Sequence, residues 1–408
     1  MKIKKCRNCR SSNLINLFDL GNISFSGKFS KKPGTIKKGH LGIVICKKCK
    51  LVQLSENFNL KYLYGPDYGY RTGINQTMVS HVKSLVKDLS KKTKLKKNEA
   101  VLDIASNDGT LLNFYSSNIT TFGIDPLIKK YNNFYKKVNY KVANFFDYKS
   151  VTKKYKSKFK IITALSVFYD LQDPNKFLSG IEKLLDRNGL AVIELADLES
   201  IIKYKMFDTI CHEHLEYYST NVLVEMFKKN NLKLIDIKSN KINGSSKQYY
   251  ICKNQSDYNV NLKKINKVIK DEKKLSLEDP KTYLNFKKKI DHIKLTLVNT
   301  IKKIKKSGKS IHGYGASTKG NVLLQYFGIG KKMLDFVAER NPKKYGFHTP
   351  GTNIKIVSEK QSRKLKPSYY LVLPWHFKRE IIKREKQTIN SGSSFIFPLP
   401  KLSIISKI

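Results

Sequence analysis

Short apolar runs that end in polar side chains recur through the middle of the chain. The run AVLDIA at 100–105 is followed by the tight polar turn SNDG, and TLLNFY at 110–115 predicts the start of a helix. Further runs predict strands at 121–125, 159–163 and 190–194, and helical patterns predict helices at 78–89 and 174–185. Strands that alternate with helices predict a doubly wound α/β sheet, whose ligands bind at the carboxyl ends of the strands.

The carboxyl-terminal part repeats this plan. Residues 310–321 predict a strand, a Gly-rich turn and a helix start, and so a second, Rossmann-like α/β domain. The Lys-rich stretch 263–306 has apolar positions at helical spacing, which predicts amphipathic helices that join the domains. The expected domains are a zinc-binding module at 1–62, a methyltransferase domain at 63–246, and a Rossmann-like domain with its helical linker at 247–408.

Composition and charge narrow the class of protein. Hydrophobic residues make up 40% of the 408 residues, but no run approaches the ~20 apolar residues of a membrane span, and no apolar stretch follows the basic start MKIKKCRNCR. We therefore expect a cytoplasmic protein without a membrane partner. The formal charge of +47 allows a nucleic-acid partner, but lysine is spread through every segment, which favours compositional drift. The charge also favours a small anionic substrate such as a nucleotide diphosphate.

Four of the six cysteines form two CxxC pairs near the start of the chain, Cys6 with Cys9 and Cys46 with Cys49. Two such pairs complete a tetrahedral thiolate site, which predicts structural zinc. A full set of four cysteines leaves no open position for catalysis, so we expect this module to shape the substrate site. A zinc module can also bind nucleic acid, and that alternative stays open.

The first two predicted strands carry the signals of a methyl-donor site. No GxGxxG pyrophosphate motif is present; Asp103 ends the first strand instead, which suits a ligand with an amino group. Asp125 lies 22 residues later (125 − 103), where an acid contacts ribose in nucleotide folds. These features predict S-adenosylmethionine binding, with an adenine contact at 144–146. The candidate cofactor residues are Asp103, Ala105, Ser106, Asn107, Asp108, Gly109, Asp125, Pro126, Asn144, Phe145 and Phe146.

The segment 207–219, FDTICHEHLEYYS, concentrates two histidines, three acids, a cysteine and two tyrosines. An HxH pair can bind metal, but no further ligand set is evident nearby. Acid–base chemistry is the favoured hypothesis, since a histidine can take a proton near neutral pH and an adjacent glutamate can orient it. His214 and Glu213 are the leading candidates, and Ser219 is expected to cap the next helix.

Together with these motifs, four further segments carry a family resemblance: YGYRTG at 68–73, NGSS at 243–246, GYGASTKGN at 313–321, and RNP at 340–342. The chain resembles the three-domain nucleotide-sugar C-methyltransferases of deoxysugar biosynthesis along nearly its whole length. The resemblance implies that a base removes a proton next to a sugar ketone and that the enolate carbon takes the methyl group. The implied catalytic residues are His214 as base, Glu213 as its helper, Tyr70 and His212. The implied substrate-binding residues are Ser246, Lys319, Asn321 and Arg340, with Lys319 and the Gly-rich turn suited to phosphate.

Two positions depart from the family pattern. Cys211 stands where the family has a tyrosine, and the loop at 167–170 lacks the family's histidine, for which Tyr169 is a candidate replacement. Oxygen or nitrogen acceptors on a related sugar therefore stay open beside carbon, and so does a zinc-assisted RNA-modifying enzyme. The sequence leaves the oligomeric state open.

Overall fold

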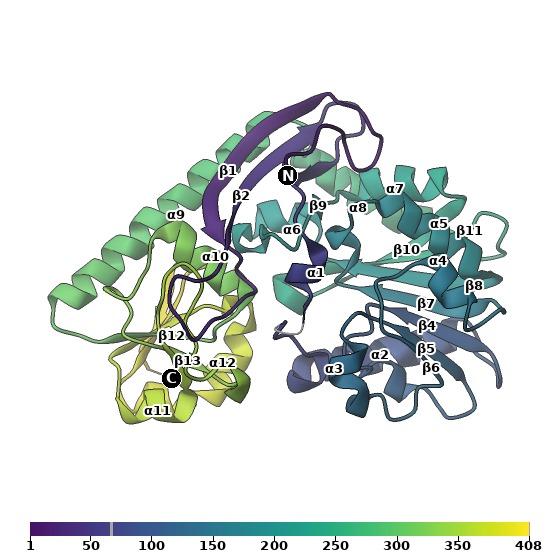
Figure 1. The fold of residues 1–408 in the computed structure, drawn as a ribbon. Coiled ribbons are helices and arrows are strands. Elements are labelled where there is room, and N and C mark those ends of the chain that lie inside the picture. The colour runs from purple at the N-terminus through teal and green to yellow at the C-terminus, as the bar shows by residue number, and fades with distance from the viewer. Residues whose placement is uncertain (66–67, 408) are drawn as a thin grey trace.

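The computed structural model describes residues 1–65 and 68–407 of the chain. Its strands form three separate sheets of four, seven and six strands, which confirms the predicted α/β class. Figure 1 shows the seven-stranded sheet in the blue and teal half of the molecule and the six-stranded sheet in the green and yellow half. A long purple hairpin, β1 and β2, arches over the two halves.

The amino-terminal sheet is antiparallel and borrows a strand from the middle of the chain. β1 pairs with β2 and β2 with β3, and β3 pairs with β9, which directly follows the HEHL residues. The zinc module is therefore joined through its own sheet to the candidate catalytic segment. The elements are β1 (Leu14–Ser24), β2 (Lys38–Cys46), β3 (Val52–Leu54), β9 (Glu216–Tyr217) and the one-turn helix α1 (Leu60–Leu63).

The central sheet has the order β10-β11-β8-β7-β4-β5-β6, and its strands β4 to β8 run parallel. Buried side chains of α5 and α7 pack on one face and those of α2 on the other, because both faces of the parallel strands are apolar. The chain order reverses between β4 and β7, which places a crevice at the carboxyl ends of these two strands. The strands are β4 (Ala100–Ile104), β5 (Thr120–Ile124), β6 (Tyr140–Val142), β7 (Phe159–Leu165), β8 (Leu185–Leu195), β10 (Leu232–Asn240) and β11 (Ser246–Lys253). The helices are α2 (Gln76–Lys92), α3 (Ile128–Tyr131), α4 (Tyr148–Thr152), α5 (Pro174–Leu184), α6 (Leu198–Lys203) and α7 (Thr220–Lys229).

The carboxyl-terminal sheet has the order β14-β13-β12-β15-β16-β17, parallel except for the last strand. The predicted linker forms two helices, α8 and α9, and α9 spans one side of this half of the molecule in Figure 1. The strands are β12 (Ile311–Tyr314), β13 (Val337–Glu339), β14 (Ile356–Ser358), β15 (Tyr369–Val372), β16 (Ser394–Phe397) and β17 (Ser403–Ile405). The helices are α8 (Leu262–Lys274), α9 (Pro280–Lys306), α10 (Thr318–Phe327), α11 (Glu359–Lys364), α12 (Lys378–Arg384) and α13 (Lys386–Asn390).

Two local expectations differ from the structure. Residues 110–115 form only one 3-10 turn, Leu112–Phe114, because the chain becomes extended at Tyr115, whose ψ is 150°. The central sheet also continues through β11 to Lys253, so the boundary expected at residue 246 falls at the start of its last strand.

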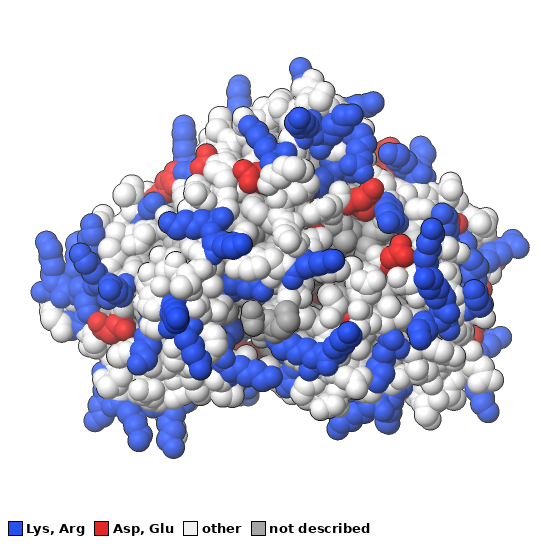
Figure 2. Space-filling model, viewed as in Figure 1, with Lys and Arg blue, Asp and Glu red and all other residues white. Residues whose placement is uncertain are grey.

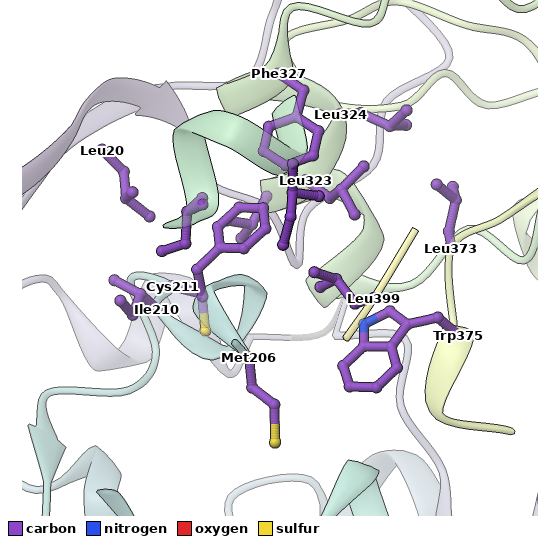
Figure 3. Close-up of a cluster of buried hydrophobic side chains, with 14 of the residues drawn as sticks. Leu20, Met206, Ile210, Cys211, Leu323, Leu324, Phe327, Leu373, Trp375 and Leu399 are labelled. Carbon is purple, nitrogen blue, oxygen red and sulfur yellow. The ribbon is translucent and has the colours of Figure 1, made fainter. Parts of the chain in front are cut away.

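A buried apolar cluster joins the two large domains just beside the candidate catalytic segment. The segment before HEHL packs on α10 and on the loop after β15, so side chains from distant parts of the sequence share one core (Figure 3). Its members include Leu20, Met206, Ile210, Cys211, Leu323, Leu324, Phe327, Leu373, Trp375 and Leu399. Among the described residues, no helix is long and apolar enough to cross a membrane.

Candidate active site

One cavity of about 290 Å³ lies where the three parts of the chain meet. Its wall runs from the end of the zinc module through the carboxyl ends of the central strands to the start of α10. The sequence-predicted residues that line it are Tyr70, Asp103, Ala105, Ser106, Asn107, Asp125, Pro126, Phe145, Glu213, His214 and Lys319. A single space therefore holds seven of the eleven candidate cofactor residues together with the candidate base.

The end of the cavity with the candidate cofactor residues, called the donor end below, is built by the loops after β4 and β5. Asp103 accepts a hydrogen bond of 2.6 Å from Thr163 Oγ1 on the neighbouring strand, and burial raises its pKa to about 7. Asp125 accepts from the backbone N–H groups of Asn107 (3.0 Å) and Leu127 (2.6 Å), and burial raises its pKa to about 6. These bonds hold two carboxylates at adjacent strand ends, where hydroxyl or amino groups of a ligand could reach them.

The turn after β4 has an unusual backbone. Ala105 and Asn107 have φ values of 58° and 51°, a left-handed conformation that is uncommon for residues other than glycine. The Asn107 side chain accepts from Thr72 N at 2.9 Å, which ties the YGYRTG segment across the cavity. Tyr70 in that segment lines the cavity while 44% of its surface is exposed, so it lies at the mouth.

His214 is held in one tautomer by the backbone. Its Nδ1–H donates to Thr209 O at 2.7 Å, which leaves Nε2 as the free acceptor nitrogen. Burial lowers the pKa of His214 to about 3, with a further contribution from the Lys319 charge, so the imidazole is neutral. The ring packs against Tyr169 with 4.3 Å between ring centroids and the two ring planes tilted by 55°.

Glu213 is almost fully buried, with 4% of its surface exposed, and its Oε2 has no hydrogen-bond partner among the described residues. Burial raises the pKa of this carboxyl, which lies beside the Cys211 thiol. A Cβ added to Gly27 would overlap Glu213 Oε1, so this glycine, in the turn after β1, leaves room for the side chain. The arrangement offers a second proton-carrying group next to His214.

Three further cavity residues carry no motif that would single them out in the sequence: Asp170, Tyr64 and Thr209. Asp170 accepts from Tyr64 OH at 2.6 Å, its Oδ1 has no partner in the described part of the chain, and burial raises its pKa. Thr209 Oγ1 is also buried without a partner among the described residues. For Asp170, the sequence contains one indication of a role in the site: it lies in the loop at 167–170, which lacks the family's histidine.

The four cysteines of the zinc module lie close together at the amino terminus. Their Sγ atoms are all within 4.8 Å of one another, and two pairs, Cys6–Cys49 and Cys9–Cys46, are 3.5 Å apart. A tetrahedron with Zn–S bonds of ~2.3 Å has edges of about 3.8 Å, so the cluster fits zinc. All four are free thiols.

Comparisons with known proteins cover the chain in three consecutive parts. Residues 6–64 match the model of a zinc-binding domain, residues 75–237 that of a methyltransferase domain, and residues 241–400 that of the C-methyltransferase carboxyl-terminal domain. The C-methyltransferase NovU of Streptomyces niveus is 25% identical over 99% of this chain and 97% of its own length. Over nearly its whole length the chain is similar to a C-methyltransferase and to the zinc-binding and carboxyl-terminal domains of that family. It is an S-adenosylmethionine-dependent methyltransferase with a structural zinc site.

Solved structures match over less of the chain. An S-adenosylmethionine-dependent methyltransferase from Clostridium acetobutylicum is 11% identical and covers 43% of this chain and 91% of its own, with a TM-score of 0.35. The N-methyltransferase NodS from Bradyrhizobium japonicum is 12% identical and covers 44% of this chain and 98% of its own, with a TM-score of 0.33.

Some expected cofactor residues of this methyltransferase lie outside the cavity wall. Asp108 fixes the YGYRTG segment by accepting from Gly73 N at 2.9 Å. Gly109, with φ 71°, is packed so closely on Tyr135 that a Cβ would clash. Phe146 packs on Phe177 instead of on the cavity, and Asn144 is exposed. These residues support the fold of the site and do not face it.

The structure also corrects the catalytic assignment of His212. Its ring is wedged between Phe25 and Phe58, with centroids 4.4 and 4.9 Å away, and its Nε2 lies 3.1 Å from Gly39 O. It is fully buried and does not line the cavity, and burial lowers its pKa to about 4. We therefore assign His212 a packing role.

Among the expected substrate residues of this methyltransferase, only Lys319 lines the cavity in the described part of the chain. Ser246 donates to Ile242 O, and Asn321 donates through Nδ2 to Ser26 O, so both are used inside the fold. Arg340 is half exposed and lies 3.9 Å from Glu380 on the surface. Lys319 itself turns toward the central domain and donates to Asn243 O at 2.8 Å.

Proposed function

We propose that this C-methyltransferase transfers a methyl group from S-adenosylmethionine to a carbon next to the ketone of a nucleotide-linked sugar. One observation carries the proposal. A neutral histidine with a free Nε2, His214, opens into the same cavity as the two carboxylates at the ends of β4 and β5. Donor and acceptor can therefore meet beside a base.

The donor end suits the chemical groups of S-adenosylmethionine. The carboxylate of Asp125 is placed to accept hydrogen bonds from ribose hydroxyls, as acids do at this position in nucleotide folds. Asp103 lies one strand over and suits the ammonium of the methionine part, and Phe145 offers a flat apolar surface to the adenine. When bound, S-adenosylmethionine supplies an electrophilic methyl group, whose bond to sulfur breaks as a bond to the acceptor carbon forms.

The residues of the chain carry the proton transfer. His214 Nε2 takes the proton from the carbon next to the ketone, the C–H electron pair forms a C=C bond, and the carbonyl π pair moves to oxygen. As the C=C pair forms the bond to the methyl carbon, the pair on oxygen re-forms the C=O bond, and His214 then releases its proton to solvent. The carboxyl groups of Glu213 and Asp170 line the same cavity, and because burial raises the pKa of both, they favour the protonated form and can donate hydrogen bonds there.

The sugar nucleotide is supported by charge as well as by the family resemblance. Figure 2 shows Lys and Arg side chains spread over the whole visible face, with no stripe or groove where they gather. Such a surface attracts anions in general but lacks the concentrated patch of a nucleic-acid binder. The Gly-rich turn between β12 and α10 lies close to the cavity, and its backbone N–H groups can hold a diphosphate.

The test is mass spectrometry of the purified enzyme with S-adenosylmethionine and a panel of UDP- and dTDP-linked 4-keto-6-deoxy sugars in heavy water. We expect a product one methylene heavier, and deuterium in the unreacted sugar next to the ketone. A methylated sugar without exchange would favour an oxygen or nitrogen acceptor. If no sugar is methylated and RNA is methylated instead, the proposal is wrong.

A further inference from the structure

We propose that Thr209 and Lys319 together bind the oxygen of the enolate, so that they act as the oxyanion site of the reaction. This inference rests on the proposed C-methylation, because only that route creates a charged oxygen next to the carbon that is attacked. Removing a proton next to a ketone is feasible only where the developing charge on oxygen is stabilised. The structure contains two donors at the right end of the cavity.

Thr209 presents a hydroxyl group with no other use. Its side chain is 2% exposed and its residue lines the cavity, yet Oγ1 has no hydrogen-bond partner among the described residues. Buried hydroxyl groups are nearly always hydrogen-bonded, so an unpaired one beside a cavity indicates a partner on the ligand. Because Thr209 O also accepts from His214 Nδ1, the hydroxyl and the base belong to one fixed unit.

Lys319 brings a positive charge to the same end of the cavity. Its Nζ donates to Asn243 O at 2.8 Å, the one hydrogen bond of this ammonium within the described part of the chain. An ammonium has three N–H donors, so two remain for a ligand. Its charge acts on His214, and burial lowers the pKa of Lys319, as expected for a cation withdrawn from solvent into a site.

Packing fixes the two donors relative to each other. Lys319 lies in the first turn of α10, and residues 206–211 pack against the same helix in the apolar cluster of Figure 3. Asp208, next to Thr209, accepts from Trp375 Nε1 at 2.7 Å, so a side chain of the carboxyl-terminal domain also holds this segment. A rigid pair of donors stabilises charge without reorganisation during the reaction.

A phosphate-binding role for Lys319 is the competing interpretation, and it fits the position less well. The Gly-rich turn and Lys319 are neighbours in sequence, but the ammonium reaches across to Asn243 and lines the cavity that holds His214. The ammonium of Lys319 is therefore better placed to bind the ketone oxygen, next to the carbon that His214 deprotonates, than to bind the diphosphate. The electron flow of the proposed reaction stays the same. The carbonyl π pair moves to oxygen, the oxygen accepts hydrogen bonds from Thr209 and Lys319, and the pair re-forms the C=O bond when the methyl group is added.

The experiment isolates the enolate step from methyl transfer. Deuterium exchange next to the ketone is measured in heavy water with S-adenosylhomocysteine present, on the UDP- or dTDP-linked 4-keto-6-deoxy sugar that the enzyme methylates. The variants are Thr209→Val, which removes the hydroxyl at nearly constant volume, and Lys319→Met. The controls are Thr209→Ser, which keeps the hydroxyl, and Lys309→Met, which removes an exposed lysine away from the cavity.

We expect Thr209→Val and Lys319→Met each to slow exchange ~100-fold, as for loss of one oxyanion donor, while S-adenosylmethionine affinity and the Lys309→Met control stay unchanged; Thr209→Ser, which keeps the hydroxyl, should recover most of the rate lost in Thr209→Val. Exchange slowed less than about tenfold in either folded variant overturns the oxyanion pair. If Thr209→Val does not fold, as judged by lost S-adenosylmethionine binding, Lys319→Met decides alone. If the unsubstituted enzyme catalyses no exchange, the C-methylation proposal itself is overturned. If the unsubstituted enzyme exchanges and the variants exchange nearly as fast, only the role of Thr209 and Lys319 is overturned.

Discussion

Replacing Arg7 with methionine should loosen the connection between the zinc module and the catalytic segment. The Arg7 side chain is 2% exposed, and its guanidinium donates to Leu54 O and Glu56 O, both at 2.8 Å, and to Leu215 O at 3.3 Å. Its Nε lies 3.7 Å from Glu216 Oε1. Leu215 and Glu216 directly follow the HEH residues, so this one buried cation holds the far end of the segment.

The magnitude follows from what the substitution leaves behind. Methionine keeps most of the apolar stem, but the Glu216 carboxyl, 1% exposed and without a hydrogen-bond partner among the described residues, loses its counter-ion. Breaking a buried ion pair by removing one partner costs about 3–5 kcal/mol. Burial already raises the pKa of Glu216, and proton uptake relieves part of the penalty, so we expect the lower end of this range. The turnover number should fall as the segment loosens, with S-adenosylmethionine affinity unchanged.

The assay is urea unfolding followed by circular dichroism, with zinc content and methyl transfer measured on the same samples. Arg10→Met is the matched control, because Arg10 pairs with Asp173 at the surface, where the two side chains are 59% and 42% exposed and a pair contributes less than about 1 kcal/mol. Adding Glu216→Gln to Arg7→Met should restore part of the stability, since no buried charge is then left unpaired. The reasoning is refuted if Arg7→Met is no more destabilising than Arg10→Met, or if the double variant regains nothing.

Three further predictions concern the cavity. His214→Gln should lower methyl transfer ~10²–10⁴-fold, the usual contribution of a general base, while calorimetry shows unchanged S-adenosylmethionine binding; retained turnover would remove His214 from the base role. Because the pKa of His214 is lowered to about 3, partly by the Lys319 charge, kcat/KM for the sugar, measured at saturating S-adenosylmethionine so that titration of Asp103 and Asp125 does not limit donor binding, should stay flat as pH falls through the ~6.5 of ordinary histidine. In Lys319→Met that pKa rises, so the acidic limb of kcat/KM should move to higher pH, and an unmoved limb would contradict the placement of Lys319. Asp125→Ala should raise the S-adenosylmethionine Kd by about tenfold or more, since hydrogen bonds to a charged group are lost; an unchanged Kd would show that Asp125 does not contact the donor.

The donor end of the site could be predicted because its signals are local. Asp103 and Asp125 each end an apolar run, and adjacent parallel strands bring such ends together in any doubly wound sheet. The zinc site could be predicted for the same reason. Each CxxC pair already brings two thiols together, so the site requires only that the two loops that carry the pairs meet.

The acceptor end could not be read from the sequence in the same way. Thr209 carries no motif, and its unpaired hydroxyl is evident only once the burial and the hydrogen bonds are known. The two histidines of HEH look equivalent, but a turn in which His214 N donates to Cys211 O directs His212 into an aromatic cluster. The sequence placed Lys319 beside the Gly-rich turn, but that its ammonium reaches Asn243 and the cavity could not be predicted, because the packing of α10 on residues 206–211 depends on contacts between distant parts of the chain.

Carbon methylation is the central claim, and labelling tests it most directly. The enzyme is supplied with S-adenosylmethionine that carries ¹³C in its methyl group and with the keto sugar it methylates, and the product is examined by NMR. The account predicts that the labelled methyl carbon is bonded to the ring carbon next to the ketone. A label bonded to oxygen or nitrogen would contradict it.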